Sequence, residues 1–125
     1  MDNQTKGALA EALVISAFVG KGCQVFLPVL TAPKYDLIAD LDGTLLKIQV
    51  KYCSKDKLDA RGGRHFKWYS PHKFDYFAVV QPKLRAPGHH IYLIPAQNVC
   101  SKFSLTTERK LAYLIFDQIE RIRAK

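Results

Sequence analysis

An Asp-Gly dipeptide at positions 42 and 43 separates two stretches of largely apolar residues. Such a dipeptide favours a two-residue hairpin loop, because both of its positions tolerate positive φ. We therefore expect strands over residues 35–41 and 44–51. With a two-residue loop Leu41 pairs with Thr44, so the numbers of paired residues add up to 85 and Asp36 lies opposite Gln49. A three-residue loop would shift this register.

The predicted hairpin has one apolar face and one face with reactive groups. Lys51 follows Gln49 by two residues and points to the same side, since side chains alternate along a strand. The other face carries Leu46, Ile48 and Val50. A carboxylate, an amide oxygen and an ammonium group are therefore expected together. The alternative is a solvated face with an ordinary Asp–Lys pair.

The pattern along the chain predicts one α/β domain over residues 1–125, with a mixed β-sheet flanked by an N-terminal and a C-terminal helix. The first helix is expected over residues 4–19, capped by Thr5 and ended by Gly20 and Gly22. Further strands are expected over residues 24–29, 74–80 and 90–94, and residues 52–73 show no regular pattern. A final helix, capped by Thr106 or Thr107, is expected to run to about Arg123.

Glu11 stands in the first helix among residues that are apolar on nearly all sides. Ala8, Ile15 and Phe18 are its neighbours on the same face. An unpaired carboxylate is costly to bury, so Glu11 is expected to have a cation nearby, either Lys51 or a metal ion. The alternative is an exposed Glu11 on the least buried side of the helix.

These residue types suit the hydrolysis of a phosphodiester. That reaction uses a divalent cation to polarise the phosphate and acidify a water molecule, and a fixed positive group for the developing charge. Mg²⁺ prefers oxygen ligands and keeps several waters, so few protein ligands suffice. Asp36, the Gln49 side-chain oxygen and the Val50 carbonyl would supply that set, with Mn²⁺ as a possible substitute. Lys51 would orient the attacking water or stabilise the transition state.

Basic residues are concentrated after the predicted hairpin. The chain has 19 Lys and Arg against 11 Asp and Glu, a net charge of +8 that points to nucleic acid. Residues 51–73 hold seven basic and two acidic residues, interleaved with Phe66, Trp68 and Tyr69. Such a segment suits contact with phosphates, and the alternative is a solvated loop whose aromatic residues cover the core. The residues expected to bind DNA are Lys34, Lys55, Lys57, Arg61, Arg64, Lys67, Lys83 and Arg85.

Four segments resemble the PD-(D/E)xK nuclease superfamily: Lys6-Gly7 with Glu11, Val25-Phe26-Leu27-Pro28, Tyr35-Asp36-Leu37-Ile38 and Ile48-Gln49-Val50-Lys51. They are most similar to the small homing endonucleases of bacterial group I introns, and next to archaeal Holliday-junction resolvases. The resemblance implies a restriction-endonuclease-like fold and a Mg²⁺-dependent, site-specific endonuclease for double-stranded DNA. It also implies that Asp36 binds metal with help from Glu11, that Gln49 holds the (D/E) position and that Lys51 is the motif lysine.

Two positions depart from the superfamily pattern. The proline that should precede Asp36 is displaced to Pro33, and Gln49 replaces a carboxylate, which removes one negative charge from the expected metal site. Two alternatives therefore stay open: a Holliday-junction resolvase of the same fold and a non-catalytic DNA-binding module. An RNA-binding protein has little support, since the aromatic residues form no recognisable stacking platform.

The final helix predicts self-association. Its apolar residues, from Leu111 to Ile122, form a band wider than one core-facing stripe, and extra apolar surface on a small domain usually meets a partner. Cutting two strands also needs two active sites, so we expect a homo-oligomer, with a dimer as the minimum and a tetramer as the alternative. The chain has neither the run of about 18 apolar residues that spans a membrane nor a secretory signal, so we expect a cytoplasmic protein without membrane contact.

Overall fold

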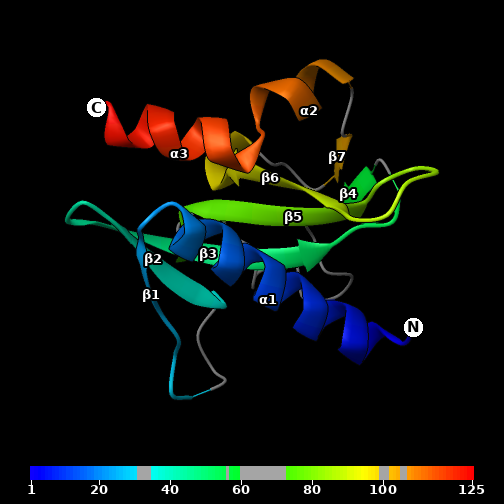
Figure 1. Ribbon diagram of the computed structural model, residues 1–125, viewed down its shortest axis with the longest axis horizontal. Coiled ribbons are helices and arrows are strands. Elements are labelled where there is room, and N and C mark those ends of the chain that lie inside the picture. The colour runs from blue at the N-terminus through cyan, green and yellow to red at the C-terminus, as the bar shows by residue number, and fades with distance from the viewer. Residues whose placement is uncertain (31–34, 56, 60–72, 99–101, 105–106) are drawn as a thin grey trace.

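The computed structural model describes residues 1–30, 35–55, 57–59, 73–98, 102–104 and 107–125. A five-stranded sheet with strand order β1-β2-β3-β5-β6 forms the centre of the protein (Figure 1). Strands β3 and β5 run parallel and the other neighbouring pairs run antiparallel, so the sheet is mixed, as expected. The elements in chain order are α1 (Asn3–Gly20), β1 (Gln24–Phe26), β2 (Leu37–Leu41), β3 (Thr44–Tyr52), β4 (Lys57–Asp59), β5 (Tyr76–Pro82), β6 (His89–Pro95), η3 (Ala96–Asn98), β7 (Lys102–Ser104), α2 (Thr107–Ala112) and α3 (Ile115–Arg123).

The β2–β3 hairpin has the predicted two-residue loop and the predicted register. Leu41 pairs with Thr44 and Leu37 with Ile48. Asp42 and Gly43 have φ of 56° and 98°, which is the positive-φ loop that an Asp-Gly dipeptide favours. Strand β2 begins at Leu37, two residues later than expected, whereas β3 continues to Tyr52.

Helix α1 begins earlier than predicted, because its capping residue is Asp2. The Asp2 carboxylate accepts a hydrogen bond from the Thr5 backbone N–H at 2.7 Å, so Thr5 lies inside the first turn. The helix ends at Gly20, and Gly22 follows with a φ of 79°, a conformation that favours glycine.

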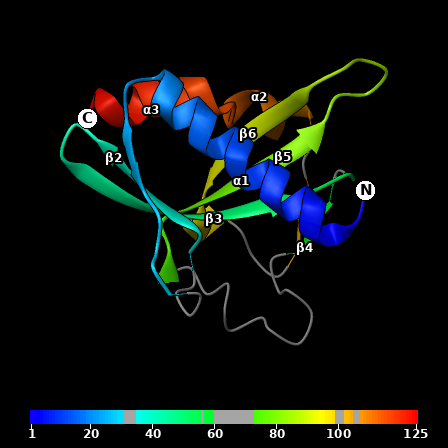
Figure 2. The ribbon, with the colours of Figure 1, turned by 60° about the horizontal axis from the view of Figure 1, so that its bottom comes forward.

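The two faces of the sheet carry separate apolar clusters. Helices α1 and α3 lie on the same face of the sheet (Figure 2), and Val14 and Phe18 of α1 belong to the same buried cluster as Ile115 and Ile119 of α3. The cluster on the other face includes Phe74, Phe77, Val79, Tyr92 and Ile94. The terminal helices thus share one core, which they complete with the predicted apolar face of the hairpin: Leu46, Ile48 and Val50.

The prediction of one continuous C-terminal helix is wrong. The chain forms two helices, α2 and α3, that are separated at Tyr113 and Leu114. The Leu93 N–H donates to the Tyr113 carbonyl at 2.7 Å, and Leu114 forms a β-bridge with Tyr92. These residues therefore pair with the edge strand β6, which a continuous helix would not allow.

Three short strands also differ from the prediction. Strand β1 ends at Phe26, and its expected continuation to Val29 is not strand. Part of the stretch that shows no regular pattern forms β4, which pairs with β7. Segments of three residues leave too few positions for a periodic signal. None of the helices within the described ranges is long and apolar enough to cross a membrane.

Candidate active site

The candidate site lies at the open end of the β2–β3 hairpin, where β3 extends beyond its partner. In the described register, pairing with β2 ends at Ile48. Two residues further along β3, the Val50 N–H donates to Asp36 Oδ2 at 2.7 Å, so a carboxylate oxygen takes the place of a strand carbonyl. The Asp36 N–H donates to the Ile48 carbonyl, also at 2.7 Å. These two hydrogen bonds hold the Asp36 side chain against β3.

The Val50 carbonyl points toward the same edge as its N–H. In a β-strand, the N–H and C=O of one residue are directed to the same neighbouring strand. Since the Val50 N–H reaches Asp36, the Val50 carbonyl also faces the Asp36 side of β3. The Asp36 carboxylate and the Val50 carbonyl therefore lie along the same edge of β3.

The charge of Asp36 interacts with those of Glu11 and Lys51. Burial raises the pKa of the Asp36 carboxyl, and this rise is opposed by the Val50 hydrogen bond and by the positive charge of Lys51. Burial also raises the pKa of Glu11, and the negative charge of Asp36 raises it further. Helix α1 thus brings its half-buried glutamate into the field of Asp36, which is a second carboxylate, and the cation expected beside Glu11 stays a prediction.

Gln49 and Lys51 are both half-buried residues of β3. By strand alternation they lie on the face opposite to the buried Ile48 and Val50. The expected cross-strand pair of Asp36 and Gln49 lies just outside the paired residues, because β2 starts one position after Asp36. The hairpin nevertheless brings both residues to the same end of the sheet.

Oxygen atoms dominate the donors at this end of the sheet. Within the described part of the chain there is no group of three or more His, Cys, Asp or Glu side chains that could hold a metal ion. Gln49 holds the position where the motif has a carboxylate. The available donors are therefore two carboxylates, one amide oxygen and one backbone carbonyl. Such donors suit Mg²⁺, which takes oxygen ligands and retains waters. The raised pKa values of two neighbouring carboxyls also fit a cation, whose charge would favour their ionised forms.

Tyr35 and Lys47 support the site and were not predicted. The Lys47 ammonium lies 5.6 Å from the centroid of the Tyr35 ring, and Tyr35 also packs against the second apolar cluster. The Lys47 backbone N–H donates to Asp75 Oδ2 at 2.8 Å. These contacts hold the chain immediately before Asp36. The alternation that groups Lys47 with Gln49 on one face is the sequence signal that could have indicated Lys47.

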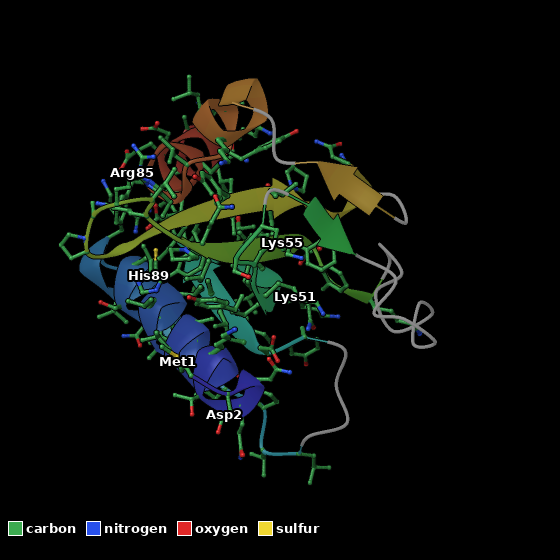
Figure 3. All side chains as sticks on the ribbon, turned by 90° about the vertical axis from the view of Figure 1, so that its right-hand side faces the viewer. Met1, Asp2, Lys51, Lys55, Arg85 and His89 are labelled. Carbon is green, nitrogen blue, oxygen red and sulfur yellow. The ribbon has the colours of Figure 1, made fainter. Side chains whose placement is uncertain are left out.

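The residues expected to bind DNA fall into three groups. Lys55, Lys83 and Arg85 are exposed, and Arg85 has a φ of 60° in the turn between β5 and β6. Figure 3 looks onto the end of the sheet where Lys51 and Lys55 lie, with Arg85 apart from them. Lys57 lies in β4. The predictions for Lys34, Arg61, Arg64 and Lys67 lie outside the described residues.

The chain belongs to the PD-(D/E)XK endonuclease family, whose model matches residues 1–124. It is 37% identical to Protein 5.3 of Escherichia phage T7 over 81 residues, which is 59% of this chain and 69% of the phage protein.

Two solved structures share the fold. The bacterial homing endonuclease I-Ssp6803I superimposes with a TM-score of 0.75 at 23% identity, covering 99% of this chain and 95% of that one. The Holliday junction resolvase Hjc of the archaeal hyperthermophile Archaeoglobus fulgidus gives a TM-score of 0.62 at 19% identity, covering 92% of this chain and 96% of the resolvase. The predicted family and its restriction-endonuclease-like α/β fold are thus confirmed.

Proposed function

We propose that this protein is a Mg²⁺-dependent, site-specific endonuclease for double-stranded DNA, of the type that promotes intron homing. The observation that carries this proposal is the Asp36 carboxylate, which the Val50 N–H holds beside Lys51 and within the field of Glu11. Membership of the PD-(D/E)XK endonuclease family supports the nuclease activity. The TM-score of 0.75 with a homing endonuclease supports the homing type.

Asp36, the Gln49 side-chain oxygen and the Val50 carbonyl would hold the metal ion, and Glu11 would assist directly or through a bound water. Mg²⁺ would polarise the scissile phosphate and acidify a water molecule, and Mn²⁺ would substitute for it. The hydrogen bonds of Asp36 to β3 fix its carboxylate before any ligand arrives. A preorganised carboxylate avoids a cost of reorientation during the reaction.

Lys51 would act on the water and on the developing charge. Its ammonium lies close enough to Asp36 to lower the pKa of that carboxyl. From this position it would orient the attacking water or stabilise negative charge on the phosphate in the transition state. The exposed Lys55, Lys83 and Arg85 would contact the DNA backbone.

A homo-oligomer would supply the second active site that cleavage of two strands requires. Leu111 and Phe116 remain 65% and 51% exposed on α2 and α3, so part of the wide apolar band of the C-terminal helices is available to a second copy. A dimer is the smallest assembly that meets the requirement, and a tetramer would extend the DNA site.

Cleavage assays with the wild-type protein and two variants test this proposal. Wild type, Lys51→Ala and Lys125→Ala would be incubated with supercoiled plasmids carrying random inserts, in Mg²⁺, in Mn²⁺ and in EDTA. Lys125 is an exposed C-terminal residue, so its variant controls for the loss of one positive charge. We expect metal-dependent cutting by wild type and Lys125→Ala, and none by Lys51→Ala.

The same assay separates the alternative functions. The structural similarity to Hjc favours a junction resolvase as the second candidate, so a four-way DNA junction is included as a substrate. Preferential cutting of the junction would replace the homing assignment with a resolvase. If DNA is bound but is not cut with either metal, the protein is a non-catalytic DNA-binding module, in which the replacement of a carboxylate by Gln49 has abolished metal-dependent cleavage.

A further inference from the structure

A second candidate site, lined by basic residues, lies beyond the C-terminal end of β3. It is a cavity of about 340 Å³, lined by the basic residues Lys55, His90 and Lys110, and by Ser54, Gln81 and Leu84 among others. The three basic residues come from three separate parts of the chain: the segment after β3, strand β6 and helix α2. The described residues that line the cavity include no carboxylate. The cavity therefore suits an anion.

Buried groups fix the backbone of this site. The Lys55 carbonyl accepts hydrogen bonds from the Cys53 thiol at 2.7 Å and from Gln81 Nε2 at 3.2 Å. Gln81 is only 6% exposed, and the Cys53 N–H donates to the Val80 carbonyl at 2.8 Å. The segment that carries Ser54 and Lys55 is thus attached to β5, in the middle of the fold, and presents its side chains from a fixed position.

We propose that this cavity binds a backbone phosphate of the DNA, near the phosphate that is cleaved. The inference rests on the proposed function, since it requires bound DNA. Lys55 and Lys110 would donate to phosphate oxygens, together with the Ser54 hydroxyl, and His90 would add a further donor. Three residues lie between Lys51 and Lys55, so the Cα atoms of these two lysines are at most about 14 Å apart. The bound phosphate would therefore lie within a few nucleotides of the cleaved one.

The salt dependence of DNA binding tests this site. Fluorescence anisotropy of a labelled 30-base-pair duplex would be measured in EDTA between about 50 and 200 mM KCl. We expect Lys110→Ala to weaken binding and to make the slope of log K against log [salt] shallower by about 0.9, the value for one phosphate contact. Lys110→Arg, which keeps the charge, and Lys125→Ala, the matched control, should retain the wild-type slope.

A double-mutant cycle tests whether Lys55 and Lys110 share one phosphate. If they do, the loss of affinity in the double alanine variant should differ from the product of the two single losses by more than about twofold. Multiplicative losses would assign the two lysines to separate phosphates and overturn the proposed site.

Two further outcomes separate this inference from the function on which it rests. A wild-type protein that neither binds nor cuts DNA would remove the proposed function itself. A wild-type protein that binds and cuts DNA, with an unchanged salt slope for Lys110→Ala, would overturn only the phosphate site. Inorganic phosphate that raises the melting temperature of wild type but not of Lys110→Ala, while both bind DNA equally, would make the cavity a site for free phosphate instead.

Discussion

Replacement of Asp36 by asparagine should stabilise the metal-free protein while it abolishes cleavage. Burial raises the pKa of the Asp36 carboxyl, so its charged form is less favourable in the folded chain than in the unfolded one. Asparagine removes that charge but keeps an oxygen that can accept the hydrogen bond of the Val50 N–H. It also removes the negative charge that adds to the effect of burial in raising the pKa of Glu11.

Asp36→Ala separates the hydrogen bond from the charge. Alanine removes both, and the Val50 N–H is left without its acceptor in a partly buried position. An unsatisfied donor of this kind costs about 1–3 kcal/mol. The free energy of unfolding of Asp36→Ala should therefore be about 1–3 kcal/mol lower than that of Asp36→Asn. For a domain of 125 residues, each 1 kcal/mol corresponds to about 3–6 °C in melting temperature.

The effect of asparagine should depend on pH. Because the pKa of Asp36 is raised in the folded protein, ionisation destabilises wild type at neutral pH. This cost decreases as the pH falls through the raised pKa toward the ordinary value of 3.8, since the folded carboxyl then binds a proton. The stability advantage of Asp36→Asn over wild type should therefore be largest near neutral pH and shrink on acidification.

Thermal unfolding in EDTA, followed by circular dichroism at several pH values, measures these differences. Asp117→Asn is the matched control, because it makes the same change at an exposed position in the first turn of α3, where a carboxylate is not destabilising. An Asp36→Asn variant that is as unstable as Asp36→Ala at neutral pH would refute the reasoning. Retained metal-dependent cleavage in Asp36→Asn would remove Asp36 from the catalytic site.

Four further variants test other parts of the structure. Lys51→Ala should lower the rate of plasmid cleavage by about 10²–10⁴-fold in a protein that remains folded, and a wild-type rate would exclude a catalytic role. Gln49→Glu should retain or tighten Mg²⁺ binding in isothermal titration calorimetry, because a carboxylate replaces a neutral amide; a loss of affinity would show that Gln49 is not a ligand. Gln118→Ala should lower the free energy of unfolding in urea by about 1–3 kcal/mol, since the buried Gln118 Nε2 donates to the Leu93 carbonyl at 2.8 Å; unchanged stability would contradict this. Phe116→Glu should shift the mass measured by light scattering toward the monomer, and an unchanged oligomer would place the interface elsewhere.

The hairpin at the centre of the candidate site could be predicted because its signals are local. Positive φ at Asp42 and Gly43 determines the loop, and the loop determines which residues of β2 and β3 pair. The alternation of apolar residues then assigns Ile48 and Val50 to the core. The cation expected beside Glu11 stays a prediction, because the neighbour that acts on Glu11 in the structure is the like-charged Asp36.

Other features depend on residues that meet only in the folded chain. The C-terminal helix is broken at Tyr113 because the edge of β6 offers its carbonyl a hydrogen bond from Leu93, twenty residues earlier. The Val50 N–H meets the Asp36 carboxylate because β2 begins only at Leu37, while β3 continues to Tyr52. No residue pattern indicates that difference in length. Lys110 of α2 and Lys55 line one cavity together with His90 of β6, although the three residues are far apart in the sequence.

Turn conformation and side-chain alternation act over a few neighbouring residues, so they can be recognised before the chain folds. Burial, hydrogen bonding between distant segments and the mutual effects of charges depend on distances through space. For this protein, the residue types of the site and the register of its hairpin follow from the local signals. Tertiary packing decides three other features: the position of the Asp36 carboxylate, the break in the last helix and the cavity lined by Lys55, His90 and Lys110. Each exists only once packing has brought its parts together.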